Sequence, residues 1–280
     1  MHCAFGTTAP DAAARWTSMF AENPASSELF YMVADTGTQL AGQYPLVPHR
    51  LQHDGKPMLG LLVADIATDP AFERQSICTT LARRLYAEAS AEAPIVFGRP
   101  NERSSPVFYN RLDWVALRPF PLLLCPLRNL THAMRARHAA LAPFGQVADA
   151  LVRAALEIPS FTSLQMQRAR GAEVQPFDDF GPWVDELWSE LAPHLGTAVI
   201  RDATFLRWRY APCRGHYRRV ALLRGGKPVG LAVSTRHGEH VYLHELMVSK
   251  DDASGARALL GWTVLEAARE GAAGVITLAT

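Results

Sequence analysis

The sequence predicts an α/β (α+β) protein with two similar halves, each built on a mixed, mostly antiparallel sheet that is flanked by helices. Runs of strand-forming residues alternate with segments whose apolar residues recur at helical spacing. Turn signals between neighbouring strands predict antiparallel hairpins. The order of predicted elements in the first half, which is a helix, three strands, a helix and a strand, returns in outline in the second half.

In the first half, a helix ends at Asn23, because Pro24 drives the residue before it out of the α region. Asp54-Gly55 marks a turn between two strands. Apolar residues spaced by four from Ile77 predict an amphipathic helix that follows directly on an apolar strand. The helices expected here are 16–23, 76–91 and 101–112, and the extended segments are 30–34, 40–44, 58–66, 94–98 and 114–124.

In the second half, residues 126–170 are helical in pattern and rich in Ala and Arg, and they read as a connector without recognisable chemistry. Gly225-Gly226 predicts a hairpin between two strands. The strands expected here are 172–174, 217–223, 229–234, 240–248 and 273–278, and the helices are 182–191, 203–210 and 256–268.

Composition excludes several classes of protein. The chain has 280 residues, of which 49% are hydrophobic and 20% charged, and this length favours two domains. Lys+Arg of 28 against Asp+Glu of 27 gives a net charge of +1, which argues against nucleic acid as a partner. The four cysteines form no C-x-x-C pair and favour a reducing compartment, so we expect a cytoplasmic protein. No apolar run approaches the ~20 residues of a membrane span.

Other chemistries lack the residues they need. The chain has no G-x-S-x-G elbow, Walker loop or G-x-G-x-x-G, so hydrolase, NTPase and dinucleotide-binding functions have no motif to rest on. His237, His240 and His244 are spaced like metal ligands, but a turn followed by a strand places only alternate residues on one face. Because the three histidines do not all share a face, we expect no metal site.

Two stretches of the first half resemble the signature of a known superfamily. Residues 65–81 (Asp-Ile-Ala-Thr-Asp-Pro-Ala-Phe-Glu-Arg-Gln-Ser-Ile-Cys-Thr-Thr-Leu) resemble a strand end "T-x-P-x-Y/F" followed by a loop "Arg/Gln-x-x-Gly-x-Gly/Ala" and an apolar helix. Residues 97–101 and 108–114 resemble "f-x-x-P-N" followed by "Y-x-x-L-G-W/F". Together with the repeated element order, they identify a tandem member of the GNAT superfamily of acyl-CoA-dependent acyltransferases, with the resemblance strong over 30–118 and loose over 171–280.

The resemblance implies an N-acyltransferase that passes an acyl group from acetyl-CoA or another acyl-CoA to the amine of a small molecule. Asp65 matches the position of the base, which acts through water, and Tyr109 matches the acid that protonates the departing thiolate. In such proteins the loop and the start of the helix hold the pyrophosphate, and the strand end and an asparagine hold the pantetheine arm. The matching residues are Ile66, Ala67, Thr68, Arg74, Gln75, Ser76, Ile77, Cys78, Thr79 and Asn101.

The domains expected on this basis are 1–125 with the acyl-CoA site, a helical connector over 126–170, and a degenerate, incomplete copy over 171–280. The second copy has lost the loop, because Lys250 to Gly255 holds two acids and one glycine. A neighbouring subunit that supplies its missing outer strands would make a homodimer.

Three alternatives stay open. Tyr109 is also typical of a core edge, and Asp65 of a strand end or cap. Glu73, Ser76 and Cys78 replace the usual basic residue and glycines of the loop, which favours a non-catalytic binding or scaffold protein. Arginines interleaved with aromatics suit an aminoacyl-tRNA-dependent transferase, or else a core of aromatics under a solvated basic face; they are Arg207, Trp208, Arg209, Tyr210, Arg214, Tyr217, Arg218 and Arg219.

Overall fold

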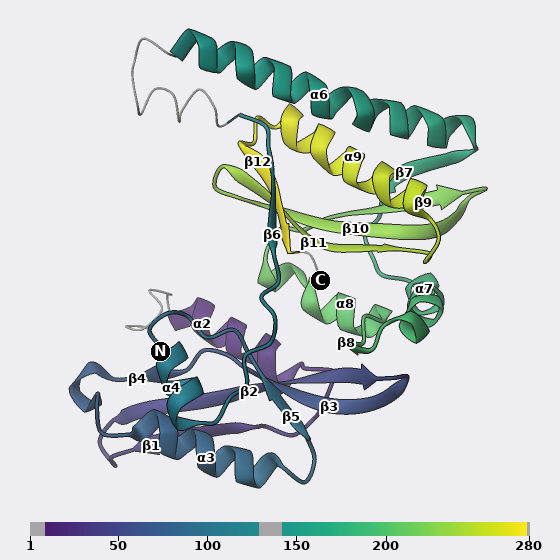
Figure 1. Ribbon diagram of the computed structural model, residues 1–280. Coiled ribbons are helices and arrows are strands. Elements are labelled where there is room, and N and C mark those ends of the chain that lie inside the picture. Colours follow the sequence, from purple (N-terminus) through teal and green to yellow (C-terminus); the bar gives the residue numbers. More distant parts are fainter. Residues whose placement is uncertain (1–8, 129–141, 279–280) are drawn as a thin grey trace. The chain divides into compact units, whose positions relative to one another are not determined.

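The chain folds into two compact units. A computed structural model describes residues 9–128 and 142–278 (Figure 1). Unit 1 consists of Met1–Arg118 and Ala192–Arg214, and unit 2 of Pro119–Leu191 and Gly215–Thr280. These bounds differ from the expected ranges 1–125, 126–170 and 171–280, and strand pairing accounts for the difference.

Unit 1 is a sheet covered by helices. Its order is β1-β2-β3-β5, with β4 and β8 also paired to β2. Neighbours along that order are antiparallel except β3 and β5, which are parallel. The elements are α2 (Ala9–Trp16), the π-helix η1 (Thr17–Ala21), β1 (Tyr31–Asp35), β2 (Leu40–His53), β3 (Lys56–Val63), β4 (Ala67–Thr68), η2 (Pro70–Phe72), α3 (Ile77–Ala89), β5 (Ile95–Phe97), α4 (Ser105–Arg111), η4 (Ala192–His194), β8 (Thr197–Val199), α8 (Ala203–Arg209) and η5 (Pro212–Arg214).

The turn between β2 and β3 forms where the sequence predicts it. Asp54 and Gly55 have φ of 47° and 76°, the left-handed pair that a two-residue hairpin loop requires. The strand expected over 58–66 ends earlier, at Val63. It ends because Asp65 has a φ of 52°, a backbone that cannot continue a strand, and the chain returns to pair Ala67 with Gln43 of β2.

The strand β2 is buried on both faces and is the centre of unit 1. Tyr44 and Leu46 pack with Leu81 and Leu85, which lie four apart on α3. Burying each such leucine contributes about 1.5–3 kcal/mol. The next residue, Val47, points to the other face, where it packs with buried aromatics, Phe20 and Trp208.

Residues 192–214 belong to unit 1 because they complete that second face. Strand β8 pairs with β2, with Val199 opposite Leu51. The indole Nε1 of Trp208 donates to the Ser18 carbonyl at 2.6 Å. Arg50 pairs with Asp202 at 2.5 Å, and Asp202 also caps α8.

Unit 2 repeats the topology of unit 1. Its sheet has the order β6-β12-β11-β10-β9-β7, in which β11 and β12 are parallel and the other pairs antiparallel. Both units therefore hold three antiparallel strands, a helix, and a strand parallel to the third, which confirms the predicted fold class. The elements are β6 (Leu122–Pro126), α6 (Ala142–Ala169), β7 (Ala172–Pro176), α7 (Trp183–Leu191), β9 (Arg218–Arg224), β10 (Lys227–His237), β11 (His240–Val248), α9 (Ala253–Arg269) and β12 (Gly274–Leu278).

The segment expected to be a connector is part of the packed layers of unit 2. Helix α9 lies on one face of the sheet, and α6 lies on α9 (Figure 1). The two helices approach closely at Gly261, where an added Cβ would stand 3.1 Å from the Cα of Ser160. Strand β6 pairs with β12, with Cys125 opposite Val275. The chain itself thus supplies an outer strand that the homodimer hypothesis had assigned to a neighbour.

Among the described residues, none of the helices combines the length and the apolar character that crossing a membrane requires. Within the same residues, no cluster of three His, Cys, Asp or Glu side chains is arranged to hold a metal ion. His237 and His244 instead make ring contacts with Tyr242.

Candidate functional site

A cavity of about 260 Å³ opens in unit 1 at the carboxyl ends of two parallel strands. Strands β3 and β5 pair as far as Leu62 and Phe97. The segments that follow each strand then line the cavity from both sides, together with α3 and α4. Ends of parallel strands are where open α/β sheets bind ligands. The lining residues are Val63, Ala64, Asp65, Ile66, Cys78, Gly98, Arg99, Pro100, Asn101, Ser104, Val107, Phe108 and Trp114.

Asp65 lies in the cavity wall and is held by a residue that the sequence did not single out. Nε of Arg15 donates to Oδ2 at 3.0 Å, and Nη2 donates to Oδ1 at 2.9 Å. The side chain of Asp65 is 13% exposed and that of Arg15 is 56% exposed. This bidentate geometry fixes the carboxylate plane. No local pattern links the two residues, because they stand 50 positions apart.

A chain of hydrogen bonds fixes the backbone at Asp65. Nε2 of Gln43 donates to the Asp65 carbonyl at 2.8 Å, and the hydroxyl of Tyr31 donates to Oε1 of Gln43 at 2.7 Å. Burial and the Asp65 carboxylate raise the pKa of Tyr31, so this hydroxyl stays protonated and remains a donor. Arg15 therefore holds the side chain of Asp65, and Gln43 holds its backbone carbonyl, so both stabilise the left-handed turn.

The loop before α3 adopts the backbone that glycines usually provide. Arg74 and Ser76 have φ of 63° and 61°, although neither is glycine. Ser76 stands at the N-cap, yet in this left-handed conformation its side chain makes no capping hydrogen bond among the described residues. The first amides of α3 lack intrahelical acceptors, as at any helix start. Turns that contain left-handed residues can direct successive backbone amides toward one point, which suits an anion.

This loop lies beside the cavity. Cys78, in the first turn of α3, lines the cavity, whereas Arg74, Gln75 and Ser76 are exposed. Burial raises the pKa of the Cys78 thiol, so it is a neutral wall residue near pH 7. Thr79 donates its hydroxyl to the Ser76 carbonyl at 2.9 Å and so braces the turn.

The residues predicted at the strand end, Ile66 to Thr68, lie in two different places. Ile66 lines the cavity, while Ala67 and Thr68 form β4 and pair with β2 along one edge. Asn101 also lines the cavity. Its Oδ1 accepts from the Ser104 backbone amide at 2.9 Å, and its own backbone N–H donates to Oγ of Ser104 at 3.0 Å, whereas its side-chain nitrogen Nδ2 has no acceptor among the described residues. That nitrogen is the atom of Asn101 able to donate to a ligand.

Tyr109 is not brought to the cavity with Asp65. It is 42% exposed and is absent from the lining, whereas Phe108 lines the cavity and is 3% exposed. Positions 104, 107 and 108 share one face of a helix, and position 109 lies about 100° away from 108. The ring of Phe108 contacts Trp114 at 4.5 Å between centroids. Between them, Asp113 has a φ of 55° at the glycine position of the motif.

Residues 2–116 match the family model described as "Acetyltransferase (GNAT) domain". This part of the chain is therefore similar to a GNAT acetyltransferase domain. None of the curated proteins matches the sequence.

Solved structures share the fold over the whole chain at low identity. The GCN5-related N-acetyltransferase from Anabaena variabilis is 13% identical with a TM-score of 0.65, and the match covers 100% of this chain and 61% of that one. The one from Kribbella flavida is 12% identical with a TM-score of 0.62, covering 100% and 59%. The N-myristoyltransferase of Saccharomyces cerevisiae, solved with bound myristoyl-CoA, is 11% identical with a TM-score of 0.54, covering 94% and 66%. The chain thus spans about three-fifths of the length of the first and second of these proteins.

Proposed function

We propose that the protein is an N-acyltransferase that transfers an acetyl or other acyl group from acyl-CoA to an amine of a small molecule. The observation that carries the proposal is the uncapped start of α3, which follows left-handed residues at 74 and 76 and adjoins the cavity through Cys78. A pyrophosphate fits such amides, because the helix macrodipole favours anions there.

The cavity supplies the remaining groups for the thioester arm. The Asn101 amide donates to the pantetheine, and the exposed Arg74 guanidinium pairs with phosphate. Glu73 is exposed, so its carboxylate is screened by water and does not fill the helix start. The structural neighbour with bound myristoyl-CoA shows that this fold accommodates an acyl-CoA.

The transfer itself forms one bond and breaks another. The amine nitrogen attacks the thioester carbonyl, the C–N bond forms, and the C–S bond breaks. Asp65, acting through water, removes the proton of the attacking nitrogen, since each carboxylate oxygen keeps a lone pair beyond the one that Arg15 occupies. Tyr109 returns a proton to the departing sulfur, and its side chain has to turn from its exposed position to do so.

Isothermal titration with acetyl-CoA tests the binding step. Ser76→Asp places a carboxylate at the start of α3, where it favours the helix and competes with the phosphates. We expect it to abolish binding without loss of stability. The matched control Ser90→Asp adds the same charge at the exposed end of α3, and we expect binding to be retained. Wild-type protein that does not bind acetyl-CoA at millimolar concentration would refute the proposal.

Turnover separates an enzyme from a binding protein. With a panel of small amines, Asp65→Asn should lower kcat by at least about 100-fold, the usual contribution of a general base. Tyr109→Phe should lower kcat with little change in affinity. Binding of acetyl-CoA without transfer to any amine would favour the non-catalytic alternative.

The RNA alternative is weakened by where its aromatics lie. Trp208 is 9% exposed and Tyr210 is 1% exposed, so neither ring presents a face for base stacking. The Arg214 guanidinium lies 4.2 Å from the Trp208 ring centroid and donates to Ser18. In unit 1, these residues serve packing.

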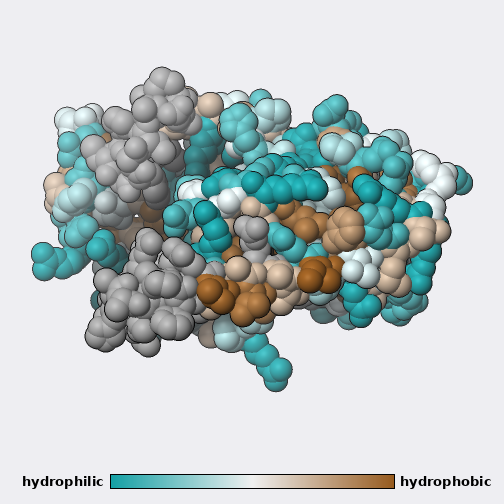
Figure 2. All heavy atoms as spheres, turned by 90° about the horizontal axis from the view of Figure 1, so that it is seen from above, coloured by the Kyte–Doolittle hydropathy of each residue, from teal (hydrophilic) through white to brown (hydrophobic). Residues whose placement is uncertain are grey.

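A second copy of the chain is the partner that we propose for α6. Figure 2 shows apolar side chains gathered on the side of the molecule that carries this helix. Val147, Leu151, Ile158 and Phe161 fall on one stripe and are 56–66% exposed. Packing two such faces together would remove these apolar side chains from water. Leu151→Glu should convert a dimeric mass in light scattering to a monomeric one, and Ala91→Glu should not.

A further inference from the structure

A second cavity, of about 380 Å³, lies in unit 2 beyond the last turn of α9. It belongs to neither the GNAT domain of residues 2–116 nor the site described above. Its wall combines cationic and hydroxyl side chains with one carboxylate. The lining residues are His216, Arg218, Ser234, Thr235, Arg236, Val241 and Glu270.

Strand pairing places three of these polar side chains on one face of the sheet. Ser234 pairs with Arg218 of β9, and Arg236 pairs with Val241 of β11. Residues that pair directly share a face. Val241 belongs to the core cluster under α9, so the polar residues lie on the α9 side, where the helix ends at Arg269. The register between β10 and β11 shifts between Val233 and Ser234, where the pairing passes over His244 of β11.

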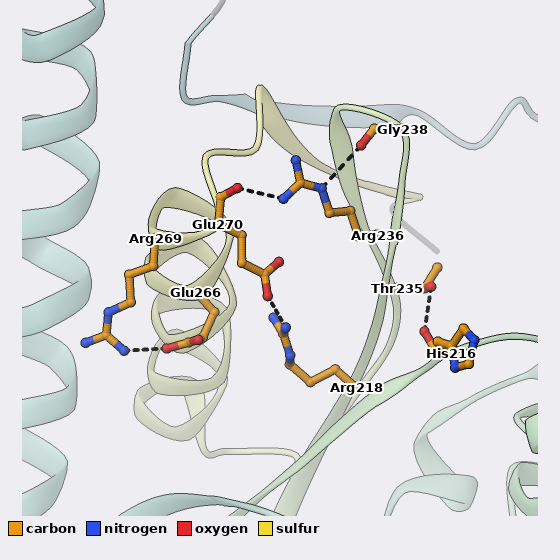
Figure 3. A network of polar contacts seen from close by, with 8 residues as sticks. All are labelled: His216, Arg218, Thr235, Arg236, Gly238, Glu266, Arg269 and Glu270. Atoms are coloured by element: carbon orange, nitrogen blue, oxygen red, sulfur yellow. Dashed lines mark hydrogen bonds and ion pairs between the residues drawn. The ribbon is translucent and has the colours of Figure 1, made fainter.

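Two guanidinium groups converge on one residue at the end of α9 (Figure 3). Arg218 forms an ion pair with the Glu270 carboxylate. Nη1 of Arg236 donates to the Glu270 carbonyl at 2.6 Å, and its Nε donates to the Gly238 carbonyl at 3.2 Å. Arg236 thus already satisfies the carbonyl end of the helix. Each guanidinium has five N–H donors, so both retain donors beyond these bonds, and two cations face a single carboxylate.

The hydroxyl of Ser234 is the group that points to a ligand. Ser234 is 4% exposed and lines the cavity, yet its hydroxyl has no hydrogen-bond partner among the described residues. Its oxygen is not one of the fully buried unpartnered atoms among the described residues, so it faces the cavity, where a ligand can reach it. By contrast, the neighbouring Thr235 hydroxyl donates to the His216 carbonyl at 2.8 Å. The Ser234 hydroxyl can therefore donate a hydrogen bond to a ligand in a cavity that Arg218 and Arg236 make positively charged.

We infer that this cavity binds a small organic monocarboxylate. The net charge of the two arginines and Glu270 is +1, which a single carboxylate neutralises. The planar carboxylate matches a guanidinium fork, and the Ser234 hydroxyl donates to one of its oxygens. The buried Val241 side chain contacts the short apolar part of the ligand. The volume lies in the range of small-molecule sites.

Titration with sodium propionate at constant ionic strength tests the site, with propionamide as the uncharged probe. We expect saturable binding of propionate by the wild-type chain and none of propionamide. Ser234→Ala should weaken propionate binding at least about fivefold, because it removes one donor and leaves the ion pairs intact.

The control Arg269→Gln removes a charge from the same end of α9. Arg269 is exposed, pairs with Glu266 and does not line the cavity, so this variant should bind propionate as the wild type does. Circular dichroism of each variant verifies that it is folded. No saturable propionate binding by the wild type would overturn the inference, as would Ser234→Ala binding that equals wild type. Binding of inorganic phosphate in place of propionate would also overturn it.

Discussion

Replacing Ser76 by glycine should stabilise unit 1. Ser76 has a φ of 61°, and a left-handed backbone costs an L-residue about 1–2 kcal/mol. Glycine adopts this backbone freely but loses more entropy on folding, which offsets about 0.4–1 kcal/mol. The net expectation for Ser76→Gly is a gain of about 0.5–1 kcal/mol in the free energy of unfolding.

The matched variant is Ser76→Ala. It keeps the Cβ, and therefore the backbone cost, and it removes a hydroxyl that makes no capping bond among the described residues. Its stability should stay within about 0.5 kcal/mol of wild type, whereas loss of a working serine cap costs about 0.5–2 kcal/mol.

Hydrogen exchange measured by mass spectrometry resolves the two units. Peptides from α3 and β2 report unit 1, and peptides from α9 serve as the internal reference in unit 2. Protection in α3 should rise in Ser76→Gly and stay level in Ser76→Ala. Lower protection of α3 in Ser76→Gly would contradict the expected gain in stability. A loss of about 0.5–2 kcal/mol in Ser76→Ala would show that Ser76 does cap the helix. Affinity for acetyl-CoA should also rise in Ser76→Gly, because the Cβ beside the amides is gone.

Three further predictions concern packing and pH. Burial lowers the pKa of His49, so the unfolded chain takes up a proton first and stability is lost as pH falls below about 6.5. In urea titrations, wild type should therefore lose more stability than His49→Gln between pH 7.5 and 5.5, at most about 1.4 kcal/mol per pH unit. Trp208→Phe removes the 2.6 Å bond to the Ser18 carbonyl, which Arg214 still satisfies, and should lower the free energy of unfolding by about 0.5–1.5 kcal/mol, measured in the same way. Gly230→Ala brings a Cβ to 2.9 Å from the Met247 carbonyl and should cost about 1–3 kcal/mol, read from exchange in β10.

The elements that could be predicted from the sequence are those whose formation depends on residues close together in the chain. The hairpin turns at Asp54-Gly55 and Gly225-Gly226 follow from the left-handed backbone that these residue types accept. Helix α3 follows from apolar residues four apart that pack on the sheet. These signals are local, so one sequence is enough to find them.

Long-range contacts account for what the sequence did not show. The pairing of β8 with β2 joins residues near 51 and 199, and nothing in either segment indicates the other. The Arg15 ion pair with Asp65 is hidden for the same reason. The place of Tyr109 outside the cavity depends on how α4 is turned about its axis. Phe108, one residue earlier, takes the inward position.

The interleaving of the two units has a consequence for synthesis on the ribosome. The polypeptide passes between the units at 118/119, 191/192 and 214/215. Domains usually fold in order as they emerge, the N-terminal one first. Here the core cluster of Phe20, Val47 and Trp208 cannot form until Trp208 has been translated. By that time much of unit 2 has already left the exit tunnel. Nascent chains stalled before that tryptophan should therefore engage chaperones more than chains stalled after it.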